Sequence, residues 1–275
     1  MITRLDKLEA TRFLKVFLAG KPKSAGKTTL ALTAPGEKLL FSFDLGNPPI
    51  PPGVDPTTVW VRQYAPSAPG VKVDSDQWIR SVNVGSQIIT DLDEVRSAFL
   101  GGRPIVLDGQ VVPLPQSLIL DGLTEWQAIT LDWVLGVNRK TDPEDFANRY
   151  TAWGKRLHIM RTLLNMTVPL PCNVTLIAWE VAELTPDGKP TGKIIPDVGG
   201  RLDNMTPGKV DAALRCFAKF QEGKTRFFVQ TKPDGIRDWL GVRGAYGGES
   251  EIEVTVTGPR KPGAPTPWEQ VFGRR

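Results

Sequence analysis

The sequence predicts an α/β fold in which a mostly parallel central sheet is flanked by helices. Apolar segments typical of strands alternate with segments of helical periodicity over most of the 275 residues. The segment 117–120 is apolar on both faces, which is typical of a central parallel strand. A turn of small residues joins the first expected strand to the first expected helix. Sheets of this kind bind ligands at the carboxyl ends of their strands, so the site is expected there.

Strands and helices are expected to follow one another along the chain. Strands are expected at 16–19, 38–43, 117–120, 174–179, 226–230 and 252–256. Helices are expected at 27–34, 91–100 and 146–164. The proline-dense stretch 48–70 predicts an irregular excursion over the surface, and 183–209 predicts a long loop or hairpin. A further element is expected at 211–220.

One domain with a tail accounts for the length of the chain. Single α/β domains of about 200–250 residues are common, so we expect one domain over residues 1–257. Residues 258–275 are rich in proline and glycine and are expected to form a flexible tail.

The composition excludes several classes of protein. No apolar run approaches the roughly 18 residues that a membrane span needs. Met1–Leu14 carries charge throughout and lacks the apolar core of a secretion signal, so the cytoplasm is expected. Cys172 and Cys216 lack the spacing of a zinc site or a disulfide framework, which predicts reduced, buried thiols. The net charge of +4 and the pI near 9.1 permit a polyanionic partner without requiring one.

The small-residue turn has the composition of a phosphate-binding loop. Phosphates need converging backbone N–H donors, a cation and a metal ligand, and Gly-Lys-Thr after a strand supplies all three. Gly26 would allow close backbone approach, Lys27 would reach the phosphates, and Thr28 would hold Mg²⁺. The nucleotide-binding set expected here is Gly20, Ser24, Ala25, Gly26, Lys27, Thr28 and Thr29. Five residues separate Gly20 from Gly26 where the common motif has four, so the entry turn should differ.

A second metal carboxylate is expected at the end of a later apolar strand. Asp121 directly follows Ser117–Leu120 and fits that role. An aspartate after an apolar strand is also an ordinary helix-capping residue, and that alternative stays open.

Several motifs together resemble a known family. In order they are GKTTL, LLFSFD, LILDGLTEWQ, a helix around Trp153-Gly154, TLIAWE, PDVGGRL and RFFVQTKPDG. Spread over Phe13–Val256, they resemble the RecA-like P-loop ATPases of bacteriophages, including single-strand annealing and recombination proteins. The resemblance implies a RecA-like P-loop NTPase fold, ATP and Mg²⁺ as cofactors, and residence in the host cytoplasm. It also implies assembly into a homo-oligomeric filament or ring.

The resemblance also raises a question about hydrolysis. In the RecA family the second strand ends in an acidic motif whose glutamate polarises the attacking water, whereas this chain has Gly46 there. Asp44 and Glu125 are candidates to replace it, with Lys27 as the phosphate-binding catalytic group. Each carboxylate could equally be a hydrogen-bond partner around the metal or a helix cap. Slow or absent turnover is expected.

DNA contacts are implied by the same resemblance for the stretch 183–209. Its glycines provide flexibility, and its candidate DNA-binding cations are Lys189, Lys193, Arg201 and Lys209. A solvated hairpin is the alternative, because this stretch has no aromatic residue for base stacking. Lys232 resembles a lysine that reaches the neighbouring subunit's nucleotide. His158 lies within the helix 146–164, which favours a packing role over a catalytic one.

The leading functional hypothesis is an ATP-binding phage protein that binds single-stranded DNA and supports recombination, annealing or replication. A single-strand-binding protein is a further expected partner, and no membrane is expected. The alternative is a nucleotide-switched helicase loader or scaffold without sustained hydrolysis, which the glycine at position 46 favours. A metabolic kinase is disfavoured because no arginine-rich lid segment is recognisable.

Overall fold

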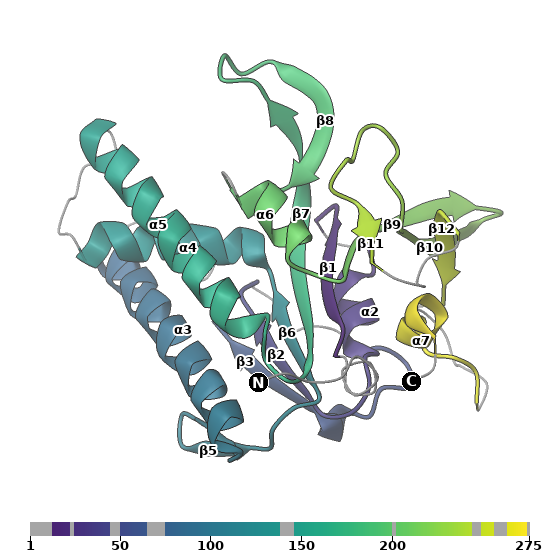
Figure 1. Cartoon of the computed structure of the whole chain (residues 1–275), viewed down its shortest axis with the longest axis horizontal. Helices are drawn as coiled ribbons and strands as arrows, with labels where there is room; N and C mark the ends of the chain where they lie inside the picture. Colours follow the sequence, from purple (N-terminus) through teal and green to yellow (C-terminus); the bar gives the residue numbers. More distant parts are fainter. Residues whose placement is uncertain are drawn as a thin grey trace, which may run out of the picture.

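A central sheet with helices on both faces organises the chain (Figure 1). The computed structural model describes residues 13–22, 25–44, 50–64, 75–137, 146–199, 202–243, 249–255 and 263–273. Within these residues the main sheet has ten strands, and its principal path runs β12-β10-β9-β1-β7-β6-β2-β3. Neighbours from β9 to β3 are parallel, while β10 and β12 add an antiparallel edge. The predicted α/β class with a mostly parallel central sheet is therefore confirmed.

The strands of the main sheet are β1 (Lys15–Gly20), β2 (Lys38–Ser42), β3 (Val59–Gln63), β6 (Ser117–Asp121), β7 (Asn173–Leu184), β8 (Pro190–Pro196), β9 (Ala212–Gln221), β10 (Lys224–Gln230), β11 (Gly241–Val242) and β12 (Glu251–Val254). A separate hairpin consists of β4 (Ile105–Leu107) and β5 (Gln110–Val112). The helices are α2 (Lys27–Leu32), α3 (Ser75–Gly101), α4 (Leu123–Val137), α5 (Phe146–Thr167), α6 (Leu202–Gly208) and α7 (Pro267–Phe272), with a 3₁₀ turn, η1, at Pro56–Thr58.

Two hydrophobic clusters pack the two faces of the sheet. Helices α3, α4 and α5 lie side by side over one face, where Trp126 and Met160 are fully buried (Figure 1). Helices α2 and α7 pack on the other face through Leu30, Trp268 and Phe272. The central strands are apolar on both sides because both faces are covered.

Two expectations about secondary structure were wrong, and one helix was not predicted. The stretch 48–70 was expected to be irregular, yet Val59–Gln63 forms β3, which pairs in parallel with β2. The helix expected from 91 begins at Ser75, since the buried apolar face that carries Leu92 continues toward the N-terminus through Ile88. The sequence interpretation also did not single out α4, which follows β6 directly.

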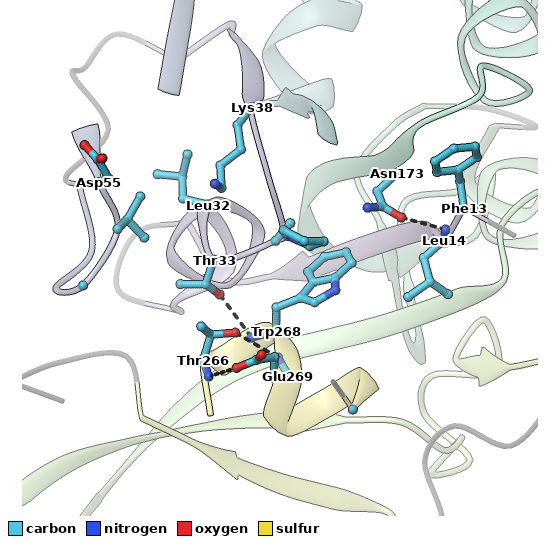
Figure 2. Close-up of a pocket in the computed structure, with 15 residues that line it drawn as sticks. Phe13, Leu14, Leu32, Thr33, Lys38, Asp55, Asn173, Thr266, Trp268 and Glu269 are labelled. Atoms are coloured by element: carbon cyan, nitrogen blue, oxygen red, sulfur yellow. Dashed lines mark hydrogen bonds between the residues drawn. The ribbon is translucent and has the colours of Figure 1, made fainter. Parts of the chain in front are cut away.

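The C-terminal segment differs from the flexible tail expected over 258–275. Thr266 caps α7 through a reciprocal capping box with Glu269, and Trp268, Val271 and Phe272 are buried. The backbone N–H of Trp268 donates to Oγ1 of Thr33 at 3.1 Å, as Figure 2 shows. The sequence before this short helix is rich in proline and glycine, but the apolar side chains of the helix pack against α2. Residues 256–262 and 274–275 lie outside the described part of the chain.

Candidate phosphate-binding site

The loop between β1 and α2 is shaped by two glycines. Gly26 is the N-cap of α2 with φ of 76°, a left-handed conformation that side chains other than glycine rarely adopt. A Cβ atom at Gly20 would lie 2.2 Å from the carbonyl oxygen of Cys216 on β9, so only glycine fits against that strand. Ala25 is buried beside the loop. Ser24 lies outside the described residues.

Lys27 occupies the loop that the sequence assigned to phosphate. Its side chain is 8% exposed, and Nζ donates to the carbonyl oxygens of Lys21 at 2.7 Å and Gly20 at 3.3 Å. Burial lowers the pKa of this amine, while nearby acidic groups, among them Asp121 and Asp44, oppose that shift. Phosphate oxygens would give the ammonium charge-assisted partners in place of neutral carbonyls.

Thr28 and Asp121 meet across the sheet as the metal hypothesis requires. The hydroxyl of Thr28 donates to Oδ2 of Asp121 at 2.7 Å, although 93 residues separate them in the chain. They come from α2 and from the carboxyl end of β6, and β7 lies between β6 and β1 in the sheet. Burial raises the pKa of Asp121 to about 6; the nearby charge of Asp44 adds to the shift, and the Thr28 hydrogen bond opposes it.

This pair fits a magnesium ion that is bound together with phosphate. Mg²⁺ is usually held by one or two carboxylates, substrate phosphates and water rather than by an all-protein cage. Within the described residues, no set of three His, Cys, Asp or Glu side chains is grouped to hold a metal. Thr28 and Asp121 would therefore contribute a hydroxyl and a carboxylate oxygen, and the nucleotide would supply further ligands. Thr29 follows in the same helical turn.

Asp44 and Glu125 stand at the same edge of the sheet. Asp44 follows β2, and the neighbouring backbone N–H of Phe43 donates to the carbonyl oxygen of Asp121 at 2.9 Å. Oδ1 of Asp44 is buried and has no hydrogen-bond partner. Burial is the main cause of a raised pKa at both carboxyls, and the charge of Asp44 also raises that of Glu125. These two carboxyls therefore share one electrostatic environment near Asp121. Gly46 lies outside the described residues.

A buried ion cluster beside the loop was not found from the sequence. Glu180 on β7 is paired with Arg215 of β9 at 3.2 Å and with Arg237 at 3.0 Å, and all three side chains are largely buried. Glu180 also contributes to the electrostatic environment of Lys27. The available signal was a carboxylate at the end of the apolar run TLIAW, but the two arginines come from later segments.

The four cations expected to contact DNA are not gathered in one place. Lys189 and Lys193 lie on the β7–β8 hairpin, which extends away from the sheet at the top of Figure 1. They form ion pairs with Asp187 at 3.2 Å and with Asp238 at 2.5 Å. Lys209 instead lies beside the amino end of β9 and donates to Asn165 of α5 at 2.6 Å. Arg201 is outside the described residues.

The remaining basic candidates lie elsewhere. Lys232 is exposed just after β10, and its carbonyl oxygen accepts from Gln230 at 3.1 Å. Arg156 of α5 is 4% exposed, and its Nη1 donates to Oε1 of Gln127 of α4 at 3.1 Å. Its guanidinium lies 4.0 Å from the ring centroid of Trp153, which is 43% exposed rather than packed in the core.

A separate cavity of about 340 Å³ lies at the opposite, amino-terminal edge of the sheet (Figure 2). Its lining includes Leu14, Lys38 and Asn173 from the starts of three strands and Trp268 from α7. The ends of α2 and β1 that form the phosphate loop face the other edge. The cavity is therefore not part of the phosphate-binding site.

The loop, its lysine and the Thr28–Asp121 pair on a mostly parallel sheet define a P-loop nucleotide-binding protein of the α/β class. The model of a family described as an AAA domain matches residues 12–236, so the chain belongs to that family. No curated protein matches the sequence. In the described part of the chain, no helix is long and apolar enough to cross a membrane.

Proposed function

We propose that the protein binds ATP with Mg²⁺ at this loop. The observation that carries the proposal is the 2.7 Å contact between Thr28 and Asp121 beside the buried ammonium of Lys27. This arrangement supplies a cation, a metal-binding pair and helix N–H groups at one edge of the sheet.

Calorimetry with ATP and Mg²⁺ tests the nucleotide proposal. Lys27→Ala should abolish binding, because the loop amides would face the phosphate charge without a counter-ion. Lys224→Ala is the matched control, since Lys224 is exposed on β10. Binding of the Lys27 variant as tight as that of the parent would show that the phosphates lie elsewhere.

Turnover is proposed to be slow. Position 46 has no carboxylate, and a missing general base typically costs about 10²–10⁴-fold in rate. Asp44 and Glu125 are the proposed acidic replacements, and their raised pKa values suit proton transfer. Gly46→Glu should raise the rate of phosphate release. A parent rate in the ordinary enzyme range of about 1–10³ s⁻¹ would contradict this proposal.

The proposed biological role is nucleotide-dependent binding of single-stranded DNA in phage recombination, annealing or replication, within an oligomer. The order of motifs resembling RecA-like proteins and the pI near 9.1 support it. Titration of fluorescent oligo-dT with and without a non-hydrolysable ATP analogue tests it. A nucleotide-dependent increase in affinity is expected.

A nucleotide-switched helicase loader or scaffold is the second candidate. The glycine at position 46 favours it, because a switch needs binding but no sustained hydrolysis. Nucleotide binding without any affinity for oligo-dT would favour this role over DNA binding.

A further inference from the structure

Two phenylalanine rings lie next to each other on the antiparallel edge of the sheet. Phe217 of β9 and Phe228 of β10 are directly opposite in the strand register. Their ring centroids are 5.6 Å apart with an interplanar angle of 22°. Both side chains are only half-buried, and neither belongs to the two hydrophobic clusters of the described chain. Core packing therefore does not explain this pair.

Cationic groups occupy the space over the faces of these rings. Nζ of Lys219 lies 5.1 Å from the centroid of Phe217 and 4.7 Å from that of Phe228. The guanidinium carbon of Arg215 lies 4.5 Å from the centroid of Phe217. Cations approach aromatic rings over the π-face, so each ring has a face turned toward the ammonium group of Lys219. A nucleobase stacks in the same position.

Side chains alternate between the two faces of β9 and β10, and this separates the surface with the two rings from the core. On β9 and β10, residues two apart share a face, and this face carries Arg215, Phe217 and Lys219 opposite Gln230, Phe228 and Arg226. We call these six residues the β9–β10 face. The other side of the same strands carries Cys216 and Val229, which are buried with α7 in the second cluster.

We propose that the β9–β10 face is a stacking surface for single-stranded DNA. Bases would stack on Phe217 and Phe228 in place of the Lys219 ammonium, and the cations would contact the phosphodiester backbone. Aromatic residues combined with a basic strand face are the usual means of binding a single strand without sequence preference. The inference rests on the proposed DNA-binding function and assigns that function to a surface with aromatic residues. The paired part of the β7–β8 hairpin, residues 180–196, has none.

The present partners of two of these cations, Lys219 and Arg226, are exchangeable. Lys219 pairs with Glu251 at 2.6 Å, and Arg226 pairs with Glu253 at 3.5 Å and with Glu222. These residues are partly or largely exposed, and exposed ion pairs contribute little free energy. Phosphate groups can therefore replace the carboxylates, with an affinity that depends on salt.

The surface begins beside the phosphate loop. Arg215 is paired in register with Ala19, the residue before Gly20. It also binds Glu180, whose charge reaches Lys27. A single arginine thus contacts both a ring of the β9–β10 face and the ion cluster next to the nucleotide site. This position gives nucleotide a direct route to influence DNA binding.

The test replaces each ring with leucine, which keeps apolar volume but removes the π-face. Phe217→Leu and Phe228→Leu should each weaken oligo-dT binding by about 5- to 150-fold, the range for loss of one stacked base. Phe220→Leu is the matched control, since Phe220 is 77% exposed on the opposite face of the same strand. Phe217→Tyr should retain binding. Calorimetric binding of an ATP analogue, unchanged in each variant, checks that the site remains folded.

The outcomes separate the two proposals. Weakening in both ring variants, with normal binding in the Phe220 and tyrosine variants, supports the stacking surface. Oligo-dT binding that is unchanged in the ring variants overturns it while leaving the DNA-binding function intact. An altered oligomer size with unchanged oligo-dT affinity would show that the β9–β10 face contacts a second copy of the chain. That result would also overturn the stacking surface. A parent protein that binds no oligo-dT in any nucleotide state would overturn both the stacking surface and the proposed DNA-binding function.

Discussion

Gly122 leaves the space that the carboxylate of Asp44 occupies: a Cβ atom at position 122 would lie 2.7 Å from Oδ1 of Asp44. The glycine directly follows Asp121 and has φ of 97°, so a side chain there would also strain the backbone. Asp44, which follows β2, can thus lie close to the carboxyl end of β6 because residue 122 has no side chain. The relationship explains why glycine follows the aspartate in the motif LILDGLTEWQ.

Gly122→Ala is therefore expected to displace Asp44 and to destabilise the protein by about 1–3 kcal/mol. Mg²⁺-dependent ATP affinity should fall as well, because Asp121 and Asp44 would both shift. Urea unfolding and calorimetry measure the two effects. Gly154→Ala in α5 is the control: it meets open space and should stabilise the helix by up to about 1 kcal/mol. Equal stability of the two variants would contradict the steric argument.

The affinity for Mg²⁺ and ATP is expected to fall as the pH decreases through about 6. Burial raises the pKa of Asp121 to about 6, and a metal ligand must be deprotonated. Below that value each pH unit should cost about tenfold in Mg²⁺ affinity. Titrations between pH 5 and 8 measure this dependence. Asp121→Asn should bind weakly at every pH and lose the inflection; an inflection that persists would assign the titration to another group.

The stability of the nucleotide-free protein depends on the titration of Asp121 in the opposite direction: it falls as the pH rises. Its folded-state pKa is higher than the value of 3.8 that applies to the unfolded chain, so the folded protein holds the proton more tightly. Its favourable contribution to the free energy of unfolding is therefore present in full below pH 3.8 and is lost as the pH rises to about 6. A comparison of parent and Asp121→Asn unfolding at pH 5 and pH 7 tests this sign. The difference between them should shift in favour of the variant at pH 7.

Trp268→Ala is expected to destabilise the protein by about 3–5 kcal/mol, as for other buried aromatic residues. Trp268 is 4% exposed, and its ring centroid lies 4.5 Å from that of Phe272. Because α7 packs on the six-residue helix α2, ATP affinity should also decrease. Thermal unfolding and calorimetry measure both effects. Leu100→Ala is the control, since Leu100 is 74% exposed and its loss should have little effect. A neutral Trp268 variant would instead favour the flexible tail expected from the sequence.

Glu180→Gln is expected to destabilise the protein by about 3 kcal/mol, because removal of one partner leaves a buried charge uncompensated. Here two arginines, Arg215 and Arg237, lose the same carboxylate. Glu183→Gln is the control on the same strand, where the side chain is only partly buried and bonds Thr191. Chemical denaturation of the two variants gives the comparison. If both variants are equally stable, the ion cluster does not hold β7 to β9.

The fold class and the core of the site could be predicted because their signals are short in sequence. The strand, the glycine turn and the helix that place Lys27 and Thr28 are consecutive, and Asp121 ends a strand whose apolar character is visible by itself. By contrast, β3 is an edge strand of mixed burial within a proline-rich stretch, so neither alternation nor a continuous apolar run identified it. Helix α7 is only six residues long and depends on α2 for its burial.

The sequence by itself determined the α/β class, the glycine-rich loop between β1 and α2, and Thr28 and Asp121 as the proposed metal-binding residues, because each was recognised from residues that are neighbours in the chain or within one strand. Only the tertiary structure decided which residues surround them. The strand order places β7 and β9 on either side of β1, and this brings Glu180 and Arg215 together beside Lys27. It also leaves Phe217 and Phe228 half-exposed on one face while Cys216 and Val229 are buried on the other. Periodicity along a strand shows that its two faces differ, but which face is covered depends on elements that fold against it from distant parts of the chain.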